Sequence, residues 1–134
     1  MGWSGSEGGC SRIFAQPSWQ TGIATHCPYY RAVPDVSFAA TGDSIVFNGS
    51  WTGVQGTSWS SPIFAAMQIE IVQEINQKVG NANYSIYSAF KSHGYGSIFR
   101  DITTGNNGVP AGPGYDLVTG IGTIDGQNGS GVRL

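Results

Sequence analysis

The most regular pattern of apolar and polar residues lies in the middle of the chain. Apolar side chains recur every four residues at Ile63, Met67, Ile71, Ile75 and Val79, and glutamines and glutamates fill other faces. This spacing is typical of an α-helix with one apolar face. The pattern predicts a helix that continues to about Val79 and stops at the glycine after it, because glycine commonly terminates helices.

A small-residue run, Gly-Thr-Ser-Trp-Ser-Ser-Pro at 56–62, precedes this repeat. Pro62 falls in the predicted first turn, where proline is tolerated because the amide groups have no intrahelical partner. Ser58 is therefore expected at or just before the helix N-terminus, where free N–H groups favour negative charge. Two interpretations follow: a helix cap, the commonest role of serine there, or a nucleophile whose oxyanion would meet those donors.

Shorter patterns predict the other elements. Asn48-Gly49 between two β-type runs is a strong hairpin signal, and the apolar run within 31–40 suits a strand buried on both faces of a parallel sheet. The predicted elements are a turn or helix from Ser18, a strand within 31–40, a hairpin of 45–47 and 51–54, and a short helix over 83–90 that ends by Gly94.

Composition narrows the class of protein. The chain has 134 residues, enough for one domain with a modest core. Charged residues are 10%, well below the ~25% of an average soluble protein, and glycine is abundant at 21 residues. This composition suits a turn-rich extracellular chain. Six basic against eight acidic residues give no basic patch, which argues against nucleic-acid binding.

Cys10 and Cys27 are the two cysteines of the chain. They are neither spaced as Cys-x-x-Cys nor clustered with histidines, which argues against a zinc site. The remaining alternatives are a single disulfide, which an extracellular chain favours, or two free thiols. His26 adjoins Cys27 in a predicted loop and is expected at the surface.

A glycine-rich loop between residues 101 and 122 contains two carboxylates fifteen residues apart, Asp101 and Asp116. Calcium binds such mixtures of carboxylate and main-chain oxygens. Aspartate and glycine are also common turn formers. The loop is therefore either a calcium site or a series of tight turns.

Together these stretches resemble the sedolisins, the serine-carboxyl peptidases of the subtilisin-like clan. Gly-Thr-Ser-x-x-x-Pro followed by Ile-Phe-Ala-Ala is similar to their nucleophile segment. Asp-Ile-Thr-x-Gly-x-Asn-Gly, then Gly-x-Gly-x-Asp-x-x-Thr-Gly-x-Gly-Thr, is similar to their calcium loop. The resemblance runs from about Trp3 to Thr123 and covers only the C-terminal third of a sedolisin catalytic domain.

The resemblance implies roles for individual residues. Ser58 corresponds to the nucleophile, and Asp35 to a structural aspartate that caps the chain or pairs with Arg31. The implied calcium ligands are two carboxylates and three main-chain carbonyls, from Asp101, Asp116, Ile102, Gly112 and Gly114.

The resemblance also implies the fold, an α/β subtilisin-like three-layer architecture with a mostly parallel sheet. Only its C-terminal portion would be present in residues 1–134. The expected segments are a Gly/Ser-rich entry loop at 1–34, a strand, hairpin and nucleophile helix at 35–80, and a short helix with the calcium loop at 81–134.

Sedolisins use a glutamate as general base, a supporting aspartate and a further aspartate at the oxyanion, all upstream of the part matched here. Glu7, Asp35 and Asp43 do not stand in those motifs. The chain also departs from the family pattern at Gln55 and at Ile124-Asp125. A serine without its base is a weak nucleophile, so little peptidase activity is expected of the isolated chain.

The expected function is thus that of the C-terminal segment of a secreted, acid-acting endopeptidase. It would act on polypeptides together with the N-terminal remainder of its domain, with calcium as cofactor and with neither nucleic acid nor membrane as partner. The alternative is a non-catalytic, calcium-stabilised binding module derived from such a peptidase.

Overall fold

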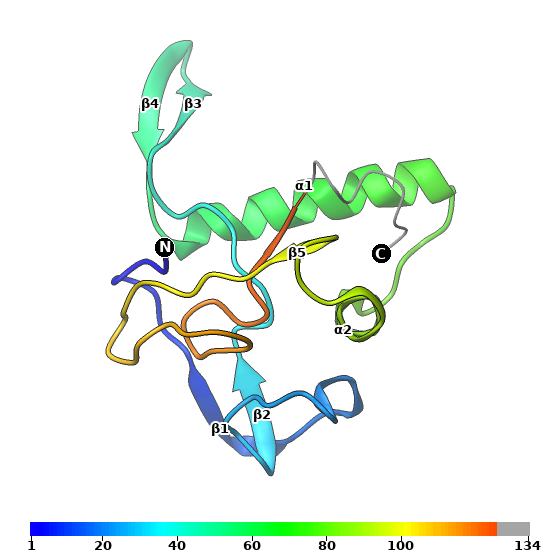
Figure 1. Cartoon of the computed structure of the whole chain (residues 1–134). Coiled ribbons are helices and arrows are strands. Elements are labelled where there is room, and N and C mark those ends of the chain that lie inside the picture. The colour runs from blue at the N-terminus through cyan, green and yellow to red at the C-terminus, as the bar shows by residue number, and fades with distance from the viewer. Residues whose placement is uncertain (126–134) are drawn as a thin grey trace.

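The computed structural model describes residues 1–125, so residues 126–134 of the third predicted segment lie outside the described part. The chain forms a mixed α/β structure with one long helix and several short strands (Figure 1). In chain order the elements are β1 (Gly9–Ala15), the 3-10 helix η1 (Ser18–Gln20), β2 (Tyr30–Val33), β3 (Asp43–Phe47), β4 (Ser50–Val54), α1 (Thr57–Ile75), α2 (Ala82–His93), β5 (Phe99–Arg100) and β6 (Thr123–Ile124).

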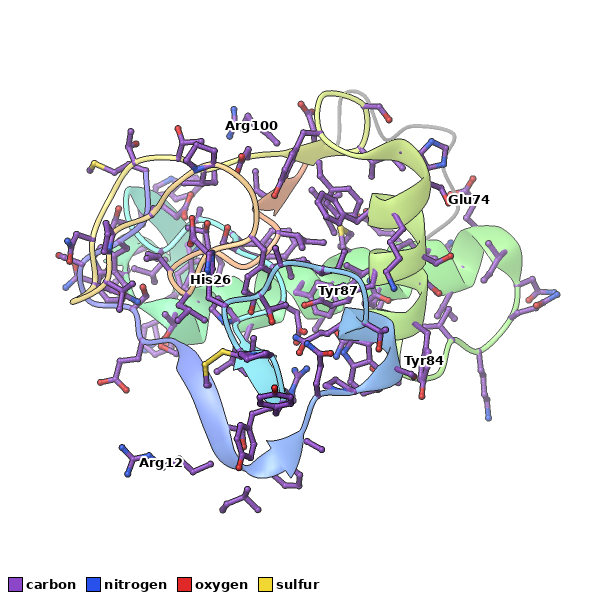
Figure 2. The ribbon with its side chains drawn as sticks, turned by 60° about the horizontal axis from the view of Figure 1, so that its bottom comes forward. Arg12, His26, Glu74, Tyr84, Tyr87 and Arg100 are labelled. Atoms are coloured by element: carbon purple, nitrogen blue, oxygen red, sulfur yellow. A yellow bond between two sulfur atoms is a disulfide. The ribbon has the colours of Figure 1, made fainter. Side chains whose placement is uncertain are left out.

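The entry segment is more ordered than a glycine-serine loop. Strands β1 and β2 pair antiparallel, with Cys10 opposite Ala32. A disulfide joins Cys10 to Cys27, as the sequence favoured, and Figure 2 shows it as a yellow bond beside β1. The predicted turn at Ser18 is confirmed as η1, and His26 is exposed as expected.

The predicted hairpin is confirmed, because β3 and β4 pair antiparallel with Phe47 opposite Ser50. Its turn residues Asn48 and Gly49 have φ angles of 50° and 77°. Such positive angles favour asparagine and glycine. The hairpin projects from the rest of the chain (Figure 1). It exposes three large apolar side chains, Val46, Phe47 and Trp51, at 61%, 60% and 78%.

The predicted mostly parallel sheet is not formed by the described residues, whose three sheets are antiparallel pairs: β1–β2, β3–β4 and β5–β6. The buried strand expected within 31–40 is represented only by β2, which ends at Val33. The next residues bond to the C-terminal loop: Ile121 N–H donates to the Asp35 carbonyl and Ser37 N–H to that of Gly122, both at 2.9 Å. A parallel strand needs neighbours reached through crossovers, and residues 1–125 provide none.

Helix α1 differs from its prediction at both ends. It begins at Thr57, so Pro62 is its sixth residue and lies beyond the first turn. It ends at Ile75, four residues before Val79, because Asn76 adopts the left-handed conformation at φ 51° and ψ 38°. Asparagine is one of the few residues besides glycine that adopt this conformation, and it terminates the helix earlier.

Helix α1 buries none of its residues in this chain. The predicted apolar face is nevertheless half-buried, at Ile63, Phe64, Met67, Ile71, Val72 and Ile75, while Ile69 on another face is 67% exposed. A helix that is apolar around much of its circumference is normally buried on more than one side. No helix among residues 1–125 combines the length and hydropathy that a membrane crossing requires.

The core instead forms around α2, which covers the predicted 83–90 helix and ends before Gly94 as expected. The Asn81 side chain caps it by accepting a hydrogen bond from the Asn83 N–H at 3.1 Å. Its buried residues Ile86, Tyr87 and Ala89 belong to one apolar cluster with residues of β5 and of the C-terminal loop. The buried cluster contains Cys27, Ala32, Ile86, Tyr87, Ala89, Ile98, Phe99, Tyr115 and Ile121.

Replacing Cys10 and Cys27 together with serine should lower the free energy of unfolding by about 3 kcal/mol, because the cross-link that restricts the unfolded chain is removed. The bond closes a sequence separation of 17 residues. Urea denaturation measures the change, and a reductant should destabilise the wild type but leave the double variant unaffected. Equal unfolding midpoints for the two proteins under oxidising conditions would contradict the prediction.

Candidate active site and metal loop

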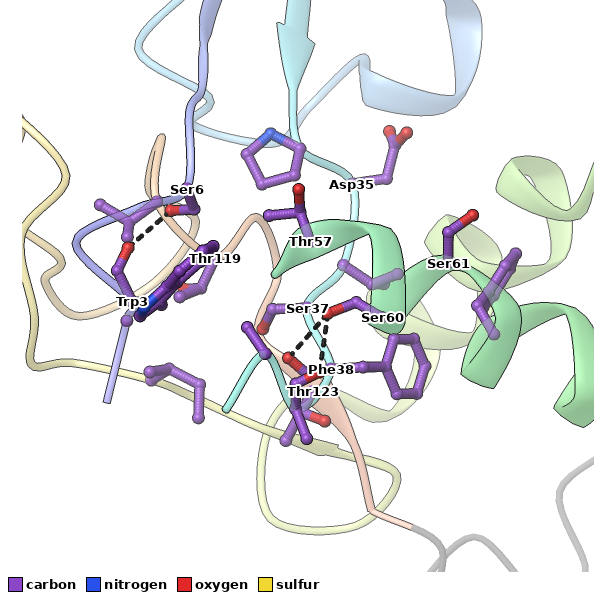
Figure 3. A pocket seen from close by; sticks show the side chains of 18 of the residues that line it. Trp3, Ser6, Asp35, Ser37, Phe38, Thr57, Ser60, Ser61, Thr119 and Thr123 are labelled. Carbon is purple, nitrogen blue, oxygen red and sulfur yellow. Dashed lines mark hydrogen bonds between the residues drawn. The ribbon is translucent and has the colours of Figure 1, made fainter. Parts of the chain in front are cut away.

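Backbone and side-chain hydrogen bonds fix the start of α1 against the segment before the hairpin. The Gly56 N–H donates to the Ala40 carbonyl at 2.7 Å. The Ser60 hydroxyl donates to the Ala39 carbonyl at 2.8 Å. Figure 3 shows Ser60 pointing toward this segment. The first turn of the helix is therefore held on the extended segment that follows β2.

A further hydrogen bond connects this turn to the hairpin. The indole N–H of Trp59 donates to Asp43 Oδ2 at 2.9 Å. Trp59 directly follows Ser58, so Ser58 lies between two tethered residues, Trp59 on one side and Gly56 on the other. Asp43, whose motif does not match a catalytic acid, thus has a structural partner.

Ser58 is the second residue of α1 and its side chain is exposed. Its expected place at the helix N-terminus is confirmed, while its catalytic role stays a prediction. The preceding Gly56 has a φ of 112°, and a Cβ there would lie 3.3 Å from the Ser58 hydroxyl oxygen. Glycine at this position therefore keeps the hydroxyl accessible. Apart from the Trp59 N–H, which donates to the Gly56 carbonyl at 3.0 Å, the first N–H groups of a helix have no intrahelical partners and favour an anion.

No acid or base in residues 1–125 hydrogen-bonds to the Ser58 hydroxyl. The carboxylate of Asp43 is bonded to the indole of the neighbouring Trp59. The arrangement is a presented serine with adjacent amide donors and no general base.

A cleft of about 830 Å³ opens beside the start of α1 (Figure 3). Its walls come from the N-terminal residues 1–7, the segment 34–41, the first turns of α1 and parts of the C-terminal loop. Thr57, Ser60 and Ser61 line it, whereas Ser58 does not. The cleft thus follows the extended segment and lies next to the serine.

Each of the two loop carboxylates accepts a hydrogen bond from a glycine N–H of the loop. Asp101 Oδ2 accepts the Gly114 N–H at 2.7 Å. Asp116 Oδ2 accepts the Gly112 N–H at 3.0 Å. The structure therefore joins four of the five predicted metal residues in two separate pairs, Asp101 with Gly114 and Asp116 with Gly112. Ile102, the fifth, follows Asp101 directly.

Asp116 is buried and largely satisfied by protein donors. Its Oδ1 accepts from the Val118 N–H at 2.9 Å, the Thr119 N–H at 2.8 Å and the Thr119 hydroxyl at 3.1 Å. This carboxylate shapes the turn at 116–120, where Asp116 and Gly120 also exchange two backbone hydrogen bonds. Removing it would leave buried N–H groups without partners.

The two glycines predicted to carry metal-binding carbonyls differ in conformation. Gly114 has a φ of 86°, which a residue with a Cβ adopts only with strain. Gly112 is not among the positive-φ residues, and a Cβ there would meet nothing within 4 Å. The need for glycine's backbone freedom is therefore supported at Gly114 and not at Gly112.

One atom of the loop has the property expected of a metal ligand. Asp101 Oδ1 is buried and has no hydrogen-bond partner, whereas Asp101 Oδ2 is satisfied by Gly114. A buried carboxylate oxygen without a partner is costly unless a cation or donor meets it. The donor set of carboxylates and main-chain carbonyls is one that calcium prefers. Residues 1–125 contain no group of three His, Cys, Asp or Glu side chains that could hold a metal, so any such site depends on carbonyls.

Asp35 is the centre of a partly buried polar network, as its structural assignment anticipated. It forms an ion pair with Arg31. Its Oδ1 also accepts from the Tyr87 hydroxyl at 3.0 Å and from the Gln20 amide at 3.4 Å. Figure 2 shows Tyr87 between α2 and the β1–β2 hairpin. The network thus connects the β1–β2 hairpin, α2 and the extended segment that begins at Pro34.

Gly120 shows how closely the loop approaches this segment. It has a φ of 64°, and a Cβ there would lie 2.3 Å from the Asp35 carbonyl oxygen. No side chain fits at that distance. The glycine therefore permits the hydrogen bond from Ile121 to Asp35 that joins the loop to the core.

Several residues of this region were not singled out by the sequence. The contacts of Trp59 and Ser60 were not predicted, because the sequence motif drew attention to Ser58 alone. Polar or aromatic residues in a first helical turn commonly contact the preceding segment. Gln20 is fully buried and bridges Ala32 and Tyr87, and no local pattern indicates this. Tyr95 has a buried hydroxyl without a partner.

No family model matches the chain, but individual relatives do. Kumamolisin of Bacillus sp. (strain MN-32) is 37% identical over 132 residues, which cover 87% of this chain and 23% of that protein. Sedolisin of Pseudomonas sp. (strain 101) is 36% identical over 126 residues, which cover 88% and 21%. Xanthomonalisin of Xanthomonas sp. (strain T-22) is also 36% identical, over 88% of this chain and 15% of its own length.

A solved structure gives the same result. Pseudomonas sedolisin, a serine-carboxyl proteinase complexed with two molecules of pseudo-iodotyrostatin, matches with a TM-score of 0.76 at 35% identity. The match covers 87% of this chain and 33% of the sedolisin chain. The chain therefore spans a third or less of the relatives it resembles.

The buried network predicts a loss of stability in alkali. Burial, and then the negative charge of Asp35, raise the pKa of Tyr87 above its ordinary value of 10.0. Above about pH 10 the unfolded chain releases this proton while the folded chain retains it, so the free energy of unfolding falls as pH rises. Tyr87→Phe should reduce the slope between pH 9 and 11 in urea titrations.

Tyr115, whose pKa burial also raises, should preserve part of that slope. Tyr29→Phe is the matched control, since this tyrosine is 78% exposed. An unchanged slope in Tyr87→Phe would show that the network does not govern alkaline stability.

Proposed function

The chain is a partial homologue of the sedolisin and kumamolisin family of serine-carboxyl peptidases, and from this premise we propose that it forms the C-terminal part of a secreted, acid-acting endopeptidase. The observation that carries the proposal is the exposed Ser58 in a Gly-Thr-Ser run at the N-terminus of α1. In this function Ser58 attacks the carbonyl carbon of a polypeptide substrate and forms an acyl-enzyme.

The remaining chemistry requires groups outside the described residues. The Ser58 proton needs a base, which in sedolisins is a glutamate. The base must be an ionised carboxylate while the oxyanion aspartate is still protonated. Both conditions are met together only at acid pH. The amide groups at the start of α1 would supply further donors to the oxyanion.

Two structural features support a missing N-terminal remainder. Helix α1 has no fully buried residue: its apolar face is only half-buried, and Ile69 on another face is 67% exposed. The extended segment 34–41 lines an open cleft on one side and bonds to the C-terminal loop on the other. A strand of the remainder lying along this segment would complete a parallel sheet, the subtilisin-like architecture predicted from the sequence, and would cover the helix.

Calcium is the cofactor of this proposal. Asp101 and Asp116 would hold it with the carbonyls of Ile102, Gly112 and Gly114, and the unpartnered Asp101 Oδ1 is the observation that favours it. Two carboxylates neutralise the ion and neutral carbonyls complete its shell without repulsion. The ion would stabilise the loop between the two aspartates, so that folding of this region is linked to calcium.

A second function rests on a different observation. No acid or base of residues 1–125 hydrogen-bonds to Ser58. The Asp101–Asp116 loop and the β1–β2 hairpin, in contrast, are held by hydrogen bonds, an ion pair and a disulfide. A non-catalytic binding module derived from a peptidase would retain those features. A coding sequence for a glutamate and aspartate on an upstream helix separates this alternative from the peptidase.

Serine-directed phosphonate probes test the role of Ser58. The isolated chain should be labelled slowly, and adding the N-terminal remainder should accelerate labelling by about 10²–10⁴-fold, the usual contribution of a general base. Ser58→Ala should abolish labelling, whereas Ser61→Ala, which alters an exposed serine of the same turn, should not. Rapid labelling of the isolated chain would reveal a base that the proposal lacks.

Calcium should raise the melting temperature of the wild-type chain relative to a chelator, and Asp101→Asn and Asp116→Asn should remove most of this increment. Asp116→Asn should also lower the melting temperature in chelator, because Asp116 accepts four hydrogen bonds from the loop. Glu70→Gln, which alters an exposed carboxylate of α1, should leave the increment intact. Equal increments in the wild type and both aspartate variants would exclude these ligands.

A further inference from the structure

Within residues 1–125, no side chain caps the start of α1. Its N-cap residue is Gly56, which has no side chain to accept a hydrogen bond, and its first turn contains no acidic residue. The free N–H groups at the start of a helix are commonly satisfied by a capping side chain, and helix ends fray. Ser58, the second residue of α1, therefore lies where the helix is held least by its own hydrogen bonds.

The chain on both sides of Ser58 is held against one residue, Asp43. In the β3–β4 hairpin Asp43 is paired with Val54, at the end of the hairpin that leads into α1. The carboxylate of Asp43 also accepts the indole N–H of Trp59, with Oδ2 and Nε1 2.9 Å apart. Residues 55–58 therefore lie between two residues, Val54 and Trp59, that both contact Asp43.

The segment between these two contacts contains a flexible residue. Gly56 has a φ of 112°, and glycine has the widest backbone freedom of any residue. With such a residue just before it, the orientation of Ser58 depends on contacts made outside the segment. The indole of Trp59 makes such a contact, and it does so at the residue adjacent to Ser58.

Packing alone does not account for this hydrogen bond. Trp59 is only half-buried, so water could satisfy its N–H if the side chain turned outward. The chain also contains an indole, that of Trp19, whose buried Nε1 has no hydrogen-bond partner among the described residues. An indole in this protein therefore does not need a carboxylate in order to pack, and the bond from Trp59 to Asp43 calls for another explanation.

We propose that Trp59 is a positioning residue for Ser58 and that Asp43 is its anchor. Their hydrogen bond fixes the first turn of α1, so that the Ser58 hydroxyl keeps one orientation relative to the N–H groups beside it. This inference rests on the proposed role of Ser58 as nucleophile. The reactivity of a nucleophile depends on its orientation, and a displacement of about 1 Å can lower a rate by about 10²-fold. Neither Trp59 nor Asp43 touches the reacting atoms, so their loss lowers the reactivity of Ser58 without abolishing it.

The rate at which a serine-directed phosphonate labels Ser58 in the full chain tests the inference. Trp59→Phe keeps an aromatic ring but loses the N–H, and it should lower the rate constant about tenfold, the factor that one hydrogen bond to a charged group contributes. Asp43→Ala should have the same effect, whereas Asp43→Asn, which keeps an acceptor oxygen, should restore most of the rate. Trp51→Phe is the matched control, since this tryptophan is 78% exposed on the same hairpin, and it should behave as the wild type.

Two further measurements distinguish positioning from a general loss of stability. Because Trp59→Phe and Asp43→Ala remove the same bond, the double variant should be labelled no more slowly than either single variant. Amide hydrogen exchange should become faster in the first turn of α1 and stay unchanged in α2, because the bond holds only the former. The melting temperatures of the variants should remain close to that of the wild type.

The outcomes separate this inference from the proposed function. If Ser58 is labelled in the wild type and at least as fast in Trp59→Phe and Asp43→Ala, the positioning role is wrong and the nucleophile stands. Additive losses in the double variant, or an equal loss in Asp43→Asn and Asp43→Ala, overturn the inference because the bond is then not the cause. Failure of the Trp59 and Asp43 variants to fold shows that the bond serves the fold alone. If the wild type is not labelled at Ser58, the nucleophile and the inference both fail.

Discussion

The carboxylate of Asp35 is the interaction on which the rest of the structure depends. It is shared by Arg31, Gln20 and Tyr87, which come from the entry hairpin and α2. The main chain of the same residue accepts from Ile121 and so joins the C-terminal loop. One residue thus connects segments that are distant in sequence, in a chain whose core is small. The start of α1 is positioned only indirectly, through the segment that follows Asp35.

Local patterns predicted what local interactions determine. Asn48-Gly49 specified the β3–β4 hairpin because its backbone angles depend on those two residues alone, and α2 ended at Gly94 for the same kind of reason. The length of α1 was predicted less well, since the apolar repeat continues past Asn76 while the backbone reverses there. The parallel sheet was inferred from family resemblance, and its strands need neighbours that residues 1–125 do not provide.

In the candidate sites, too, features set by local sequence could be predicted and features set by distant contacts could not. The position of Ser58 followed from its place before a helical repeat, and the Asp101–Asp116 loop from its glycines and carboxylates. Gln20 could not be predicted, because its importance comes from burial against Tyr87, which is far away in sequence. A polar side chain signals nothing in sequence until the fold determines whether water can reach it.

The β3–β4 hairpin has a consequence for how the chain behaves in concentrated solution. It consists of two strands, so each strand has an outer edge whose backbone groups are not paired within a sheet. Val46, Phe47 and Trp51 extend from it into solvent, and the bond between Trp59 and Asp43 keeps it upright on the start of α1. Unprotected edges with apolar side chains recruit strands from other molecules. The β3–β4 hairpin next to the start of α1 is therefore the place where copies of the isolated chain would first associate with one another.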